Sequence, residues 1–541
     1  MTIDNDYIAE QFSLLGKLMD IHGENSFKTK SYTIAAFTLE KLPTPIQNIP
    51  ADKLTSIKGI GDAIGKKIVE IIETGHLRLL QQYIANTPPG VIEMLRIKGL
   101  GPKKIATIWK EMEIESVGEL LYACQENRLL LYKGFGEKTQ DNVREAIEFR
   151  LRHIGSHLYA DIEPYALQLD TDLKKTFPTA QLAVTGDFRR QLETVTKLEF
   201  VTTATSAATN EYLAANPSEE GITIEFIHSS PEDFARTLFE TSCSREFLEA
   251  FRERTTLTHY PSSEETLFAQ CNLPYIPPYR REQPIALEQP AVPSLQTADI
   301  RGIIHSHSKW SDGSNTLPEM AAACIEKGLQ YLVISDHSKT AVYANGLQVD
   351  HLNAQHAEID ALNRQLAPFV IFKSIESDIL GDGALDYSGD VLSTFDLVIA
   401  SVHANLKMTE EKAMSRLLRA IENPYTTILG HLTGRLLLSR PGYPVDHKKI
   451  IDACIANHVV IELNAHPRRL DMDWRWIGHA LDKGALISID PDAHSINGYN
   501  DIRYGVLAAR KAGLTPDKNL SSFTLDQFNS FLTSRKKFKG I

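Results

Sequence analysis

The chain has 541 residues, more than a single hydrophobic core organises, and we therefore expect several domains. Its hydrophobic content of 43% and charged content of 23% are typical of a soluble globular protein. The formal net charge of −12 argues against nonspecific nucleic-acid binding over the whole surface, while leaving room for local contacts through backbone amides and a few lysines.

Cysteine usage and the N-terminus indicate where the protein resides. The five cysteines are widely scattered and show no C-x-x-C spacing, a pattern that favours a reducing cytoplasm. The opening MTIDNDYIAEQF lacks a basic segment followed by an apolar run, and no apolar stretch is long enough to span a bilayer. We therefore expect a cytoplasmic protein without membrane contacts.

The first part of the chain has the pattern of two helices. Apolar residues recur at helical spacing over residues 5–42, as in Ile8, Phe12 and Leu15 and again at Tyr32, with HGENSF as the break between the two runs. This pattern predicts a helical hairpin.

Three self-similar passages follow the hairpin, at residues 57–68, 97–105 and 132–143, and each reads Lys-Gly-apolar-Gly before an amphipathic helix. Two glycines at a helix N-terminus leave backbone N–H groups exposed, and the helix dipole adds partial positive charge, so a phosphate fits there. A single passage of this kind would more simply be a packing joint between helices, but three copies favour phosphate binding. The candidate phosphate-binding residues are Gly59, Gly61, Lys67, Gly99, Gly101, Lys103, Gly134, Gly136 and Lys138.

These passages resemble helix-hairpin-helix motifs, which bind the DNA backbone without reading its sequence. Residues 1–150 as a whole resemble the N-terminal region of family X DNA polymerases, including the segment MDIHGENSFKTKSYTIAA. In that family a lysine after the first hairpin forms a Schiff base with an abasic-site sugar, and Lys67, or else Lys66, occupies the matching position. A solvated, phosphate-binding Lys67 is the alternative that we favour.

The family X resemblance continues over residues 151–285. The stretch AVTGDFRRQLETVTKLEFV matches the family's Gly-Ser-x-Arg-Arg segment, with Gly186, Arg189 and Arg190 in register. The two arginines are candidate DNA-binding residues that contact a backbone phosphate. Ion pairs within the protein are the alternative.

The metal-binding aspartates of that family are missing from this segment. Their matched positions carry Lys197 and Glu199, and the third carboxylate falls on Glu225. Nucleotidyl transfer needs carboxylates that hold two Mg²⁺ ions about 4 Å apart, and a lysine among them repels both ions. We therefore expect a folded domain whose polymerase site is degenerate and whose polymerase activity is lost.

The C-terminal residues 299–541 contain seven strand-like apolar runs separated by helix-like segments. Six runs lead directly into His, Asp or Glu, in HSHSKWSDG, SDHS, ESD, VHAN, GHLTGR and DPDAHS, and one further run ends in ELNAH. This alternation predicts a (β/α) barrel, in which side chains at the C-terminal strand ends meet at one mouth. Because so many buried donors would otherwise need other partners, the pattern favours a metal site over structural histidines.

The donor types indicate the metal and the chemistry. Imidazoles with a few carboxylates suit Zn²⁺, Mn²⁺ or Fe²⁺ better than Mg²⁺, which prefers oxygen ligands. Clustered cations of this kind bind a phosphate ester and activate water near neutral pH. The sequence therefore predicts phosphoester hydrolysis at the barrel mouth.

The same motifs, together with ELNAHPRRLDMDW and PDAHSINGYNDIRYGV, closely resemble the polymerase and histidinol phosphatase (PHP) domain at the C-terminus of bacterial family X polymerases. The resemblance to that family extends over essentially the whole chain. It implies a site for up to three divalent ions, Mn or Zn and alternatively Fe. The nine matched metal ligands are His305, His307, Asp312, His337, Glu376, His403, His431, Asp492 and His494.

Three further residues are candidate catalytic groups. Arg435 in GHLTGRL and Arg469 in HPRRLD, with Arg468 as the alternative to Arg469, are expected to clamp phosphate oxygens. Asp336 directly precedes a predicted ligand and is expected to orient an imidazole. For each of these residues a local salt bridge is the alternative.

We therefore expect a multidomain protein with an all-α helix-hairpin-helix N-terminal region, an α/β nucleotidyltransferase-like middle and a C-terminal distorted (β/α)7 PHP barrel. The predicted parts are a lyase-like helical domain with the first hairpin at 1–90, a fingers-like hairpin region at 91–150, a degenerate palm- and thumb-like domain at 151–285, a linker at 286–298 and the PHP domain at 299–541.

This organisation predicts a metal-dependent DNA phosphodiesterase that acts as a 3′→5′ exonuclease in DNA repair, with abasic-site endonuclease activity as a second function. A gap-filling DNA polymerase of family X and a PHP small-molecule phosphatase are the alternatives. Lys197 argues against the polymerase, and the three hairpins argue against the phosphatase. A DNA-binding scaffold with structural metals is a third alternative, disfavoured because structural metal sites are closed and rarely polynuclear.

Overall fold

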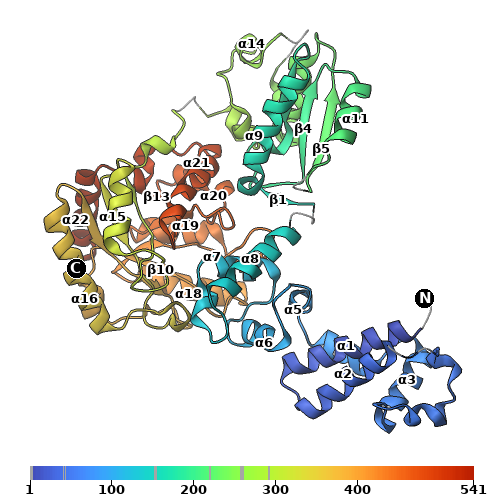
Figure 1. Ribbon diagram of the computed structural model, residues 1–541. Coiled ribbons are helices and arrows are strands. Elements are labelled where there is room, and N and C mark those ends of the chain that lie inside the picture. The colour runs from blue at the N-terminus through green and yellow to red at the C-terminus, as the bar shows by residue number, and fades with distance from the viewer. Residues whose placement is uncertain are drawn as a thin grey trace. The chain divides into compact units, whose positions relative to one another are not determined.

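The computed structural model describes residues 4–40, 42, 44–151, 155–218, 221–255, 261–289 and 293–541 (Figure 1). It contains two compact units, one formed by residues 1–125 and 129–148 and the other by residues 126–128 and 149–541. The first unit combines the two predicted hairpin regions, and the second combines the middle segment with the barrel. The finer boundaries stay predictions, and residues 290–292 of the predicted linker lie outside the described residues.

The N-terminal unit begins with the predicted helical hairpin. Helices α1 (Asn5–His22) and α2 (Ser26–Glu40) pack through buried residues that include Phe12 and Tyr32, whose ring centroids are 5.8 Å apart. Gly16 lets the helices approach closely, because a Cβ at that position would lie 3.3 Å from Thr33 Oγ1.

Each of the three Lys-Gly-apolar-Gly passages joins two helical segments. The first glycine of each turn has a positive φ, 98° at Gly59, 94° at Gly99 and 96° at Gly134, which a side chain would strain. The joined pairs are η2 (Ala51–Ser56) with α3 (Asp62–Thr74), α5 (Pro89–Met94) with α6 (Pro102–Lys110), and η3 (Arg128–Leu131) with α8 (Glu137–Leu151). η1 (Ile46–Asn48) precedes the first pair, and α4 (Arg78–Ala85) and α7 (Val117–Gln125) lie between the pairs.

The middle segment is an α/β fold. It contains a three-stranded sheet of order β2-β4-β5, in which β2 is antiparallel to β4 and β5 is parallel to β4. The strands β1 and β3 form a separate antiparallel pair. The strands are β1 (His157–Leu158), β2 (Leu182–Thr185), β3 (Thr194–Val195), β4 (Lys197–Thr202) and β5 (Thr223–His228). The helices are α9 (Tyr159–Thr176), α10 (Gly186–Arg189), α11 (Ser206–Ala215), α12 (Phe234–Thr241), α13 (Arg245–Arg254) and α14 (Glu264–Gln270).

The C-terminal segment forms a parallel barrel from the seven predicted runs. Its strands are β6 (Gly302–Ile303), β7 (Tyr331–Ile334), β8 (Val370–Lys373), β9 (Glu376–Asp378), β10 (Val398–Ser401), β11 (Thr426–Leu429), β12 (Val460–Asn464) and β13 (Ile487–Asp490), with β8 and β9 belonging to one run. Two parallel sheets, β6-β7-β8 and β9-β10-β11-β12-β13, are joined by parallel bridges from Ser306 to Ala493 and from His337 to Glu376. The first bridge lies beyond the C-terminal ends of β6 and β13, and the second joins the segment after β7 to the start of β9, so the ring closes at the predicted mouth.

Helices alternate with these strands along the chain, as the (β/α) pattern predicts. They are α15 (Leu317–Glu326), α16 (Val349–Leu366), α17 (Gly389–Leu392), α18 (Glu410–Glu422), α19 (His447–Ala456), α20 (Trp474–Asp482), α21 (Ile502–Lys511) and the final α22 (Leu525–Lys539).

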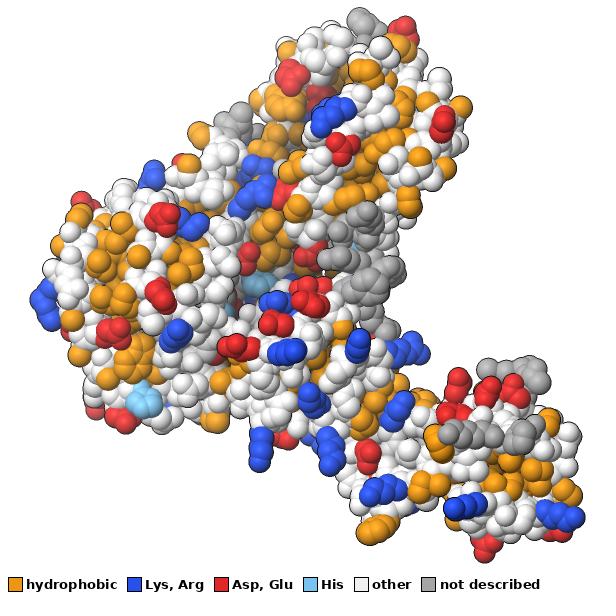
Figure 2. Space-filling model, viewed as in Figure 1, with side chains coloured by type: hydrophobic (Ala, Val, Ile, Leu, Met, Phe, Trp, Pro, Cys, Tyr) orange, Lys and Arg blue, Asp and Glu red, His pale blue; other side chains and the backbone are white. Residues whose placement is uncertain are grey.

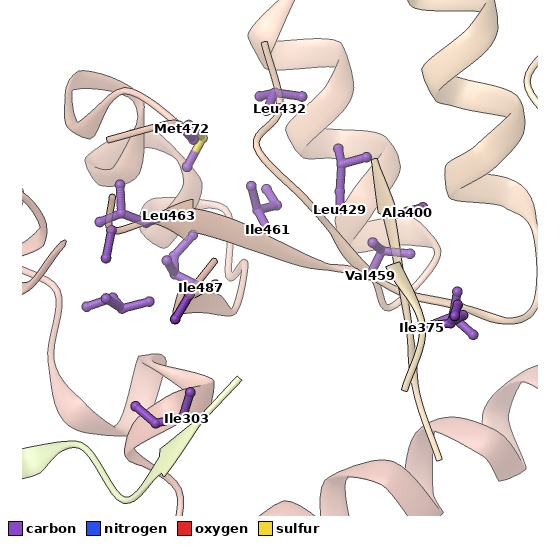
Figure 3. Packing of buried hydrophobic residues seen from close by; sticks show 14 of the residues in the cluster. Ile303, Ile375, Ala400, Leu429, Leu432, Val459, Ile461, Leu463, Met472 and Ile487 are labelled. Carbon is purple, nitrogen blue, oxygen red and sulfur yellow. The ribbon is translucent and has the colours of Figure 1, made fainter. Parts of the chain in front are cut away.

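Two apolar layers hold the barrel. One face of the strands packs against the surrounding helices, and Figure 3 shows Leu429, Ile461 and Ile487 in this layer. The other face, which includes Tyr331, packs against Phe528 of α22, and the Tyr331 and Phe528 ring centroids are 4.5 Å apart. Since Tyr331 is the first residue of its strand, this apolar filling lies toward the N-terminal strand ends and leaves the opposite mouth to polar side chains.

Candidate metal centre

The nine predicted metal ligands lie at the start of one barrel strand or in the segments that follow other strands. His305 and Asp492 flank the Ser306–Ala493 bridge and have positive φ values of 60° and 52°, a strained conformation that surrounding contacts must hold. Eight of the nine side chains are buried, and His403 is half-buried. In chain order they are His305, His307 and Asp312 after β6, His337 after β7, Glu376 at the start of β9, His403 after β10, His431 after β11, and Asp492 and His494 after β13.

The structure brings these nine side chains together. Three groups have ligand atoms that all lie within 4.8 Å of one another and could hold a metal ion: His307, Asp312, His337 and His494; His305, His307, Glu376 and Asp492; and His337, Glu376 and His403. His431 joins them through its Nε2, which lies 3.0 Å from Glu376 Oε1. The groups share members, so they form one continuous centre.

Several donor atoms at this centre fit a divalent cation. Among the described residues, the buried atoms His305 Nε2, Asp312 Oδ2 and His494 Nε2 make no hydrogen bond. Buried polar atoms without hydrogen bonds are rare in folded proteins because their desolvation is costly. Imidazole nitrogens and carboxylate oxygens are also the donors that Zn²⁺, Mn²⁺ and Fe²⁺ accept.

Carboxylates set the protonation of the imidazoles. Burial alone would lower the pKa of His403, but the carboxylates of Glu376 and Asp378 outweigh burial and raise this pKa to about 9. Burial likewise opposes protonation of His494, and Asp312 raises the pKa of His494 to about 9. At neutral pH each of these two imidazoles therefore holds a proton that a metal ion must displace.

Two buried carboxylates beside the centre escaped the sequence analysis. Glu462 Oε1 lies 2.5 Å from His305 Nδ1, and Asp378 Oδ1 lies 2.5 Å from His403 Nδ1. For Asp378 a signal was present as strand alternation, because this residue stands two positions after Glu376 on the same strand and so shares its face.

Asp336 organises a loop. Its carboxylate accepts hydrogen bonds from Ser308 N at 2.7 Å, from Ser311 Oγ at 2.5 Å and from Gln355 Nε2 at 2.6 Å. These contacts order the segment that leads into Asp312. Orientation of an imidazole by Asp336 stays a prediction.

The two candidate arginine clamps differ in their surroundings. Arg435 donates to Asp473 Oδ2 at 2.6 Å and to the Arg469 carbonyl at 2.9 Å, which supports the salt-bridge alternative for Arg435. Arg469 is buried, and its Nε lies 3.7 Å from Asp492 Oδ2, at the edge of the centre. Arg468 lies 3.9 Å from Asp161 of α9.

In the middle segment an ammonium lies between two carboxylates, at the positions where the sequence resemblance predicted a degenerate metal site. Lys197 Nζ lies 2.8 Å from Glu199 Oε1 and 2.7 Å from Glu225 Oε2, and these hydrogen bonds raise the pKa of Lys197. A Cβ at Gly186 would lie 2.0 Å from Glu199 Oε2, so this carboxylate covers the turn that begins α10. The contacts support a degenerate polymerase site.

Arg189 and Arg190 form ion pairs within the protein. Arg189 Nη1 lies 2.8 Å from Glu264 Oε1, and Arg190 Nε lies 2.6 Å from Glu282 Oε1. Their side chains are only 20% and 13% exposed. These contacts support the ion-pair alternative for both residues over contact with a DNA phosphate.

The N-terminal candidates lie on exposed turns. Gly61, Gly101 and Gly136 are exposed, and a Cβ at any of them would meet no other atom within 4 Å. On the face drawn in Figure 2, Lys and Arg side chains gather over the part of this unit that holds α6. The lysines beside the turns keep part or all of their surface exposed: Lys67, Lys103 and Lys138.

Comparison with known proteins shows the family to which the chain belongs. A helix-hairpin-helix domain family matches residues 3–77, and the SAM-like helix-hairpin-helix tandem family matches residues 91–148. The DNA polymerase/3′-5′ exonuclease PolX of Bacillus subtilis is 32% identical over 558 aligned residues, which cover 95% of this chain and 96% of that protein. The chain belongs to the PolX family.

The chain has further relatives that match less than half of it. A probable phosphatase of Thermoanaerobacter sp. is 25% identical over 247 residues, covering 44% of this chain and 96% of that protein. A probable phosphatase of Syntrophotalea carbinolica is 28% identical over 240 residues, covering 42% of this chain and 94% of that protein. The chain is thus an enzyme of the PHP phosphoesterase type, as its motifs predict.

Two other findings complete the comparison. The solved structure of histidinol phosphate phosphatase from Lactococcus lactis matches 40% of the PolX chain and 94% of its own chain, with a TM-score of 0.32 and 17% identity. Within the part of the chain that the structure describes, each helix is too short or too polar to cross a membrane.

We expect the metal affinity of this PolX chain to rise with pH between 7 and the pKa of about 9 found for His403 and His494. Each displaced proton makes the affinity about tenfold stronger per pH unit. Calorimetric titration with Zn²⁺ in two buffers of different ionisation enthalpy counts the released protons. His403→Asn should release one proton fewer, and an affinity independent of pH would contradict the assignment.

Proposed function

We propose that this protein is a metal-dependent DNA phosphodiesterase that acts as a 3′→5′ exonuclease in DNA repair. The proposal rests on the continuous cluster of metal-binding donors at the barrel mouth. Its three groups are linked because His307, His337 and Glu376 each belong to two of them. The Bacillus subtilis relative is named a DNA polymerase/3′-5′ exonuclease, which supports the proposed direction of degradation. Abasic-site cleavage at the same centre is the proposed second activity.

The nine predicted ligands would hold up to three Mn²⁺ or Zn²⁺ ions, or Fe²⁺. Such ions, when bound, lower the pKa of water and offset negative charge on phosphate oxygens. In this proposal Arg469, beside Asp492, holds a phosphate oxygen of the DNA, because its planar fork suits that group. Asp336 keeps the loop before Asp312 in place for the same chemistry.

The helix-hairpin-helix turns supply the proposed DNA contacts. Two matched hairpin families and three exposed glycine turns support backbone binding that does not depend on base sequence. Residues 1–90 and 91–150 would hold the duplex, residues 151–285 would space the neighbouring parts, and residues 299–541 would cleave. The five free cysteines support a cytoplasmic location.

The two enzymatic alternatives are less well supported. A family X polymerase would need two metal ions where Lys197 already bridges Glu199 and Glu225. A small-molecule phosphatase would leave the hairpin regions without a purpose, since the aligned probable phosphatase corresponds to 44% of this chain.

The first test is a DNA degradation assay. With Mn²⁺ and 3′-recessed or single-stranded labelled DNA, the protein should shorten the strand stepwise and release nucleoside monophosphates. His337→Ala and His494→Ala should each slow shortening at least about a hundredfold, because loss of a ligand removes several kcal/mol of charge stabilisation. DNA binding, measured by filter retention, should remain.

The matched control is His447→Ala, since this imidazole stacks on Trp476 with ring centroids 4.6 Å apart and belongs to none of the three groups. It should degrade DNA at the wild-type rate. Extension of the primer when dNTPs are added would contradict the degenerate polymerase site. Hydrolysis of a phosphomonoester, with no degradation of the DNA, would favour the small-molecule phosphatase.

The second test measures the salt dependence of DNA binding. Lys67→Ala, Lys103→Ala and Lys138→Ala should each weaken binding equally on all sequences and reduce the slope of log Kd against log salt by about one. Lys483→Ala, which removes an ion pair with Asp452 in the barrel segment, should leave the slope unchanged. An unchanged slope in all three hairpin variants would contradict phosphate binding by these turns.

A further inference from the structure

One strand of the barrel contributes nothing to the predicted ligand set. Residues 293–541 are all described, and of the seven strand runs within them only β12 (Val460–Asn464) carries none of the nine residues. Yet β12 is buried along its whole length and lies between β11 and β13, whose ends carry His431, Asp492 and His494. Its inward-facing side chains therefore lie among the ligands of other strands.

Glu462 of β12 ties together ligands from two strands. Its Oε1 lies 2.5 Å from His305 Nδ1, and its Oε2 accepts a hydrogen bond of 2.5 Å from the backbone N–H of His431. Since Glu462 occupies Nδ1, the other ring nitrogen of His305 is directed to the centre, where His305 Nε2 lies 3.2 Å from Glu376 Oε1 and 3.4 Å from Asp492 Oδ1. Glu462 is fully buried, so solvent does not compete for these contacts.

Asn464 lies two residues further along β12 and holds a third ligand. Its Nδ2 donates to Asp492 Oδ2 at 3.0 Å, which leaves Asp492 Oδ1 facing His307 Nε2 at 3.0 Å. The Asn464 side chain is itself fixed, because its Oδ1 accepts from the backbone N–H of His466 at 3.1 Å. The intervening Leu463 points to the opposite face and packs in the apolar layer of Figure 3.

The strand that begins with Glu376 repeats this arrangement. Asp378 Oδ1 lies 2.5 Å from His403 Nδ1, and Thr340 Oγ1 donates to Asp378 Oδ2 at 2.7 Å. His403 Nε2 then lies 3.1 Å from Glu376 Oε1. The same arrangement thus occurs twice, on two different strands: a carboxylate contacts Nδ1 of a histidine, and Nε2 of that histidine faces the centre.

We propose that β12 is a positioning strand, on which Glu462 and Asn464 hold His305, His431 and Asp492 in the orientation that binds a metal ion. The inference rests on the proposed metal centre and adds to it the residues that fix the ligands. A hydrogen bond to the far side of an imidazole fixes its tautomer and ring orientation, and the loss of such a partner costs about 10- to 100-fold in metal affinity.

The test compares metal affinity in the full-length protein without DNA, by competition for Zn²⁺ against a chromogenic chelator. Glu462→Gln keeps the shape of the side chain but removes its charge, and Asn464→Ala removes the hydrogen bond to Asp492. Each variant should bind Zn²⁺ about 10- to 100-fold more weakly. Nitrogen NMR of the histidine rings should show a changed tautomer balance at His305 in Glu462→Gln alone.

Asp396→Asn is the matched control. Asp396 Oδ2 accepts from the Lys373 backbone N–H at 2.8 Å and stands just before β10, away from the mouth, so its loss should leave Zn²⁺ affinity unchanged. Far-ultraviolet circular dichroism verifies that each variant is folded before its affinity is compared.

The outcomes separate this inference from the proposed function. Wild-type Zn²⁺ affinity in both folded variants would overturn the positioning role and leave the nuclease proposal standing. Weakened Zn²⁺ affinity in both variants would support the positioning role. If the wild-type protein binds Zn²⁺ but leaves DNA intact, the nuclease proposal is overturned while the positioning role stands. An equal loss of affinity in Asp396→Asn would also overturn the positioning role, because the effect would not be specific to the mouth.

Discussion

Four imidazoles converge on one buried carboxylate at the barrel mouth. Glu376 Oε1 lies 3.0 to 3.2 Å from a ring nitrogen of His305, of His403 and of His431. Glu376 Oε2 lies 3.0 Å from a ring nitrogen of His337. Burying so many ionisable groups is costly unless each one is compensated, so this carboxylate must stay within reach of every ring. The bridge between His337 and Glu376, at the seam between the two sheets, fixes it there.

Two parts of the same chain compensate clustered carboxylates in different ways. In the middle segment the ammonium of Lys197 lies between the carboxylates of Glu199 and Glu225 and offsets part of their charge. At the barrel mouth the compensating groups are imidazoles, which can exchange a proton for a divalent ion. The difference supports the proposal that this PolX family member keeps its middle domain as structure and carries out its chemistry at the PHP barrel.

The sequence predicted the barrel and the positions of its candidate ligands because six of the seven apolar runs lead directly into His, Asp or Glu. Glu462 carried no such signal because it lies within a strand, and Asn464 ends its strand with an amide, which is not a typical metal ligand. The partners of these two residues are 28 to 157 residues away in the sequence. The pairing of Arg435 with Asp473 and with backbone carbonyls depends on a loop conformation that residue spacing does not encode. The ion pairs of Arg189 and Arg190 likewise depend on Glu264 and Glu282, which are distant in the sequence.

The most direct test of the account is to locate bound metal by anomalous diffraction at the manganese edge, from crystals of the full-length protein grown with Mn²⁺. The account predicts anomalous peaks at the barrel mouth, among His307, Glu376 and His494, and no peak between Glu199 and Glu225. A peak beside Glu199 and Glu225, or a mouth without any peak, would contradict the claim that the barrel holds the catalytic centre.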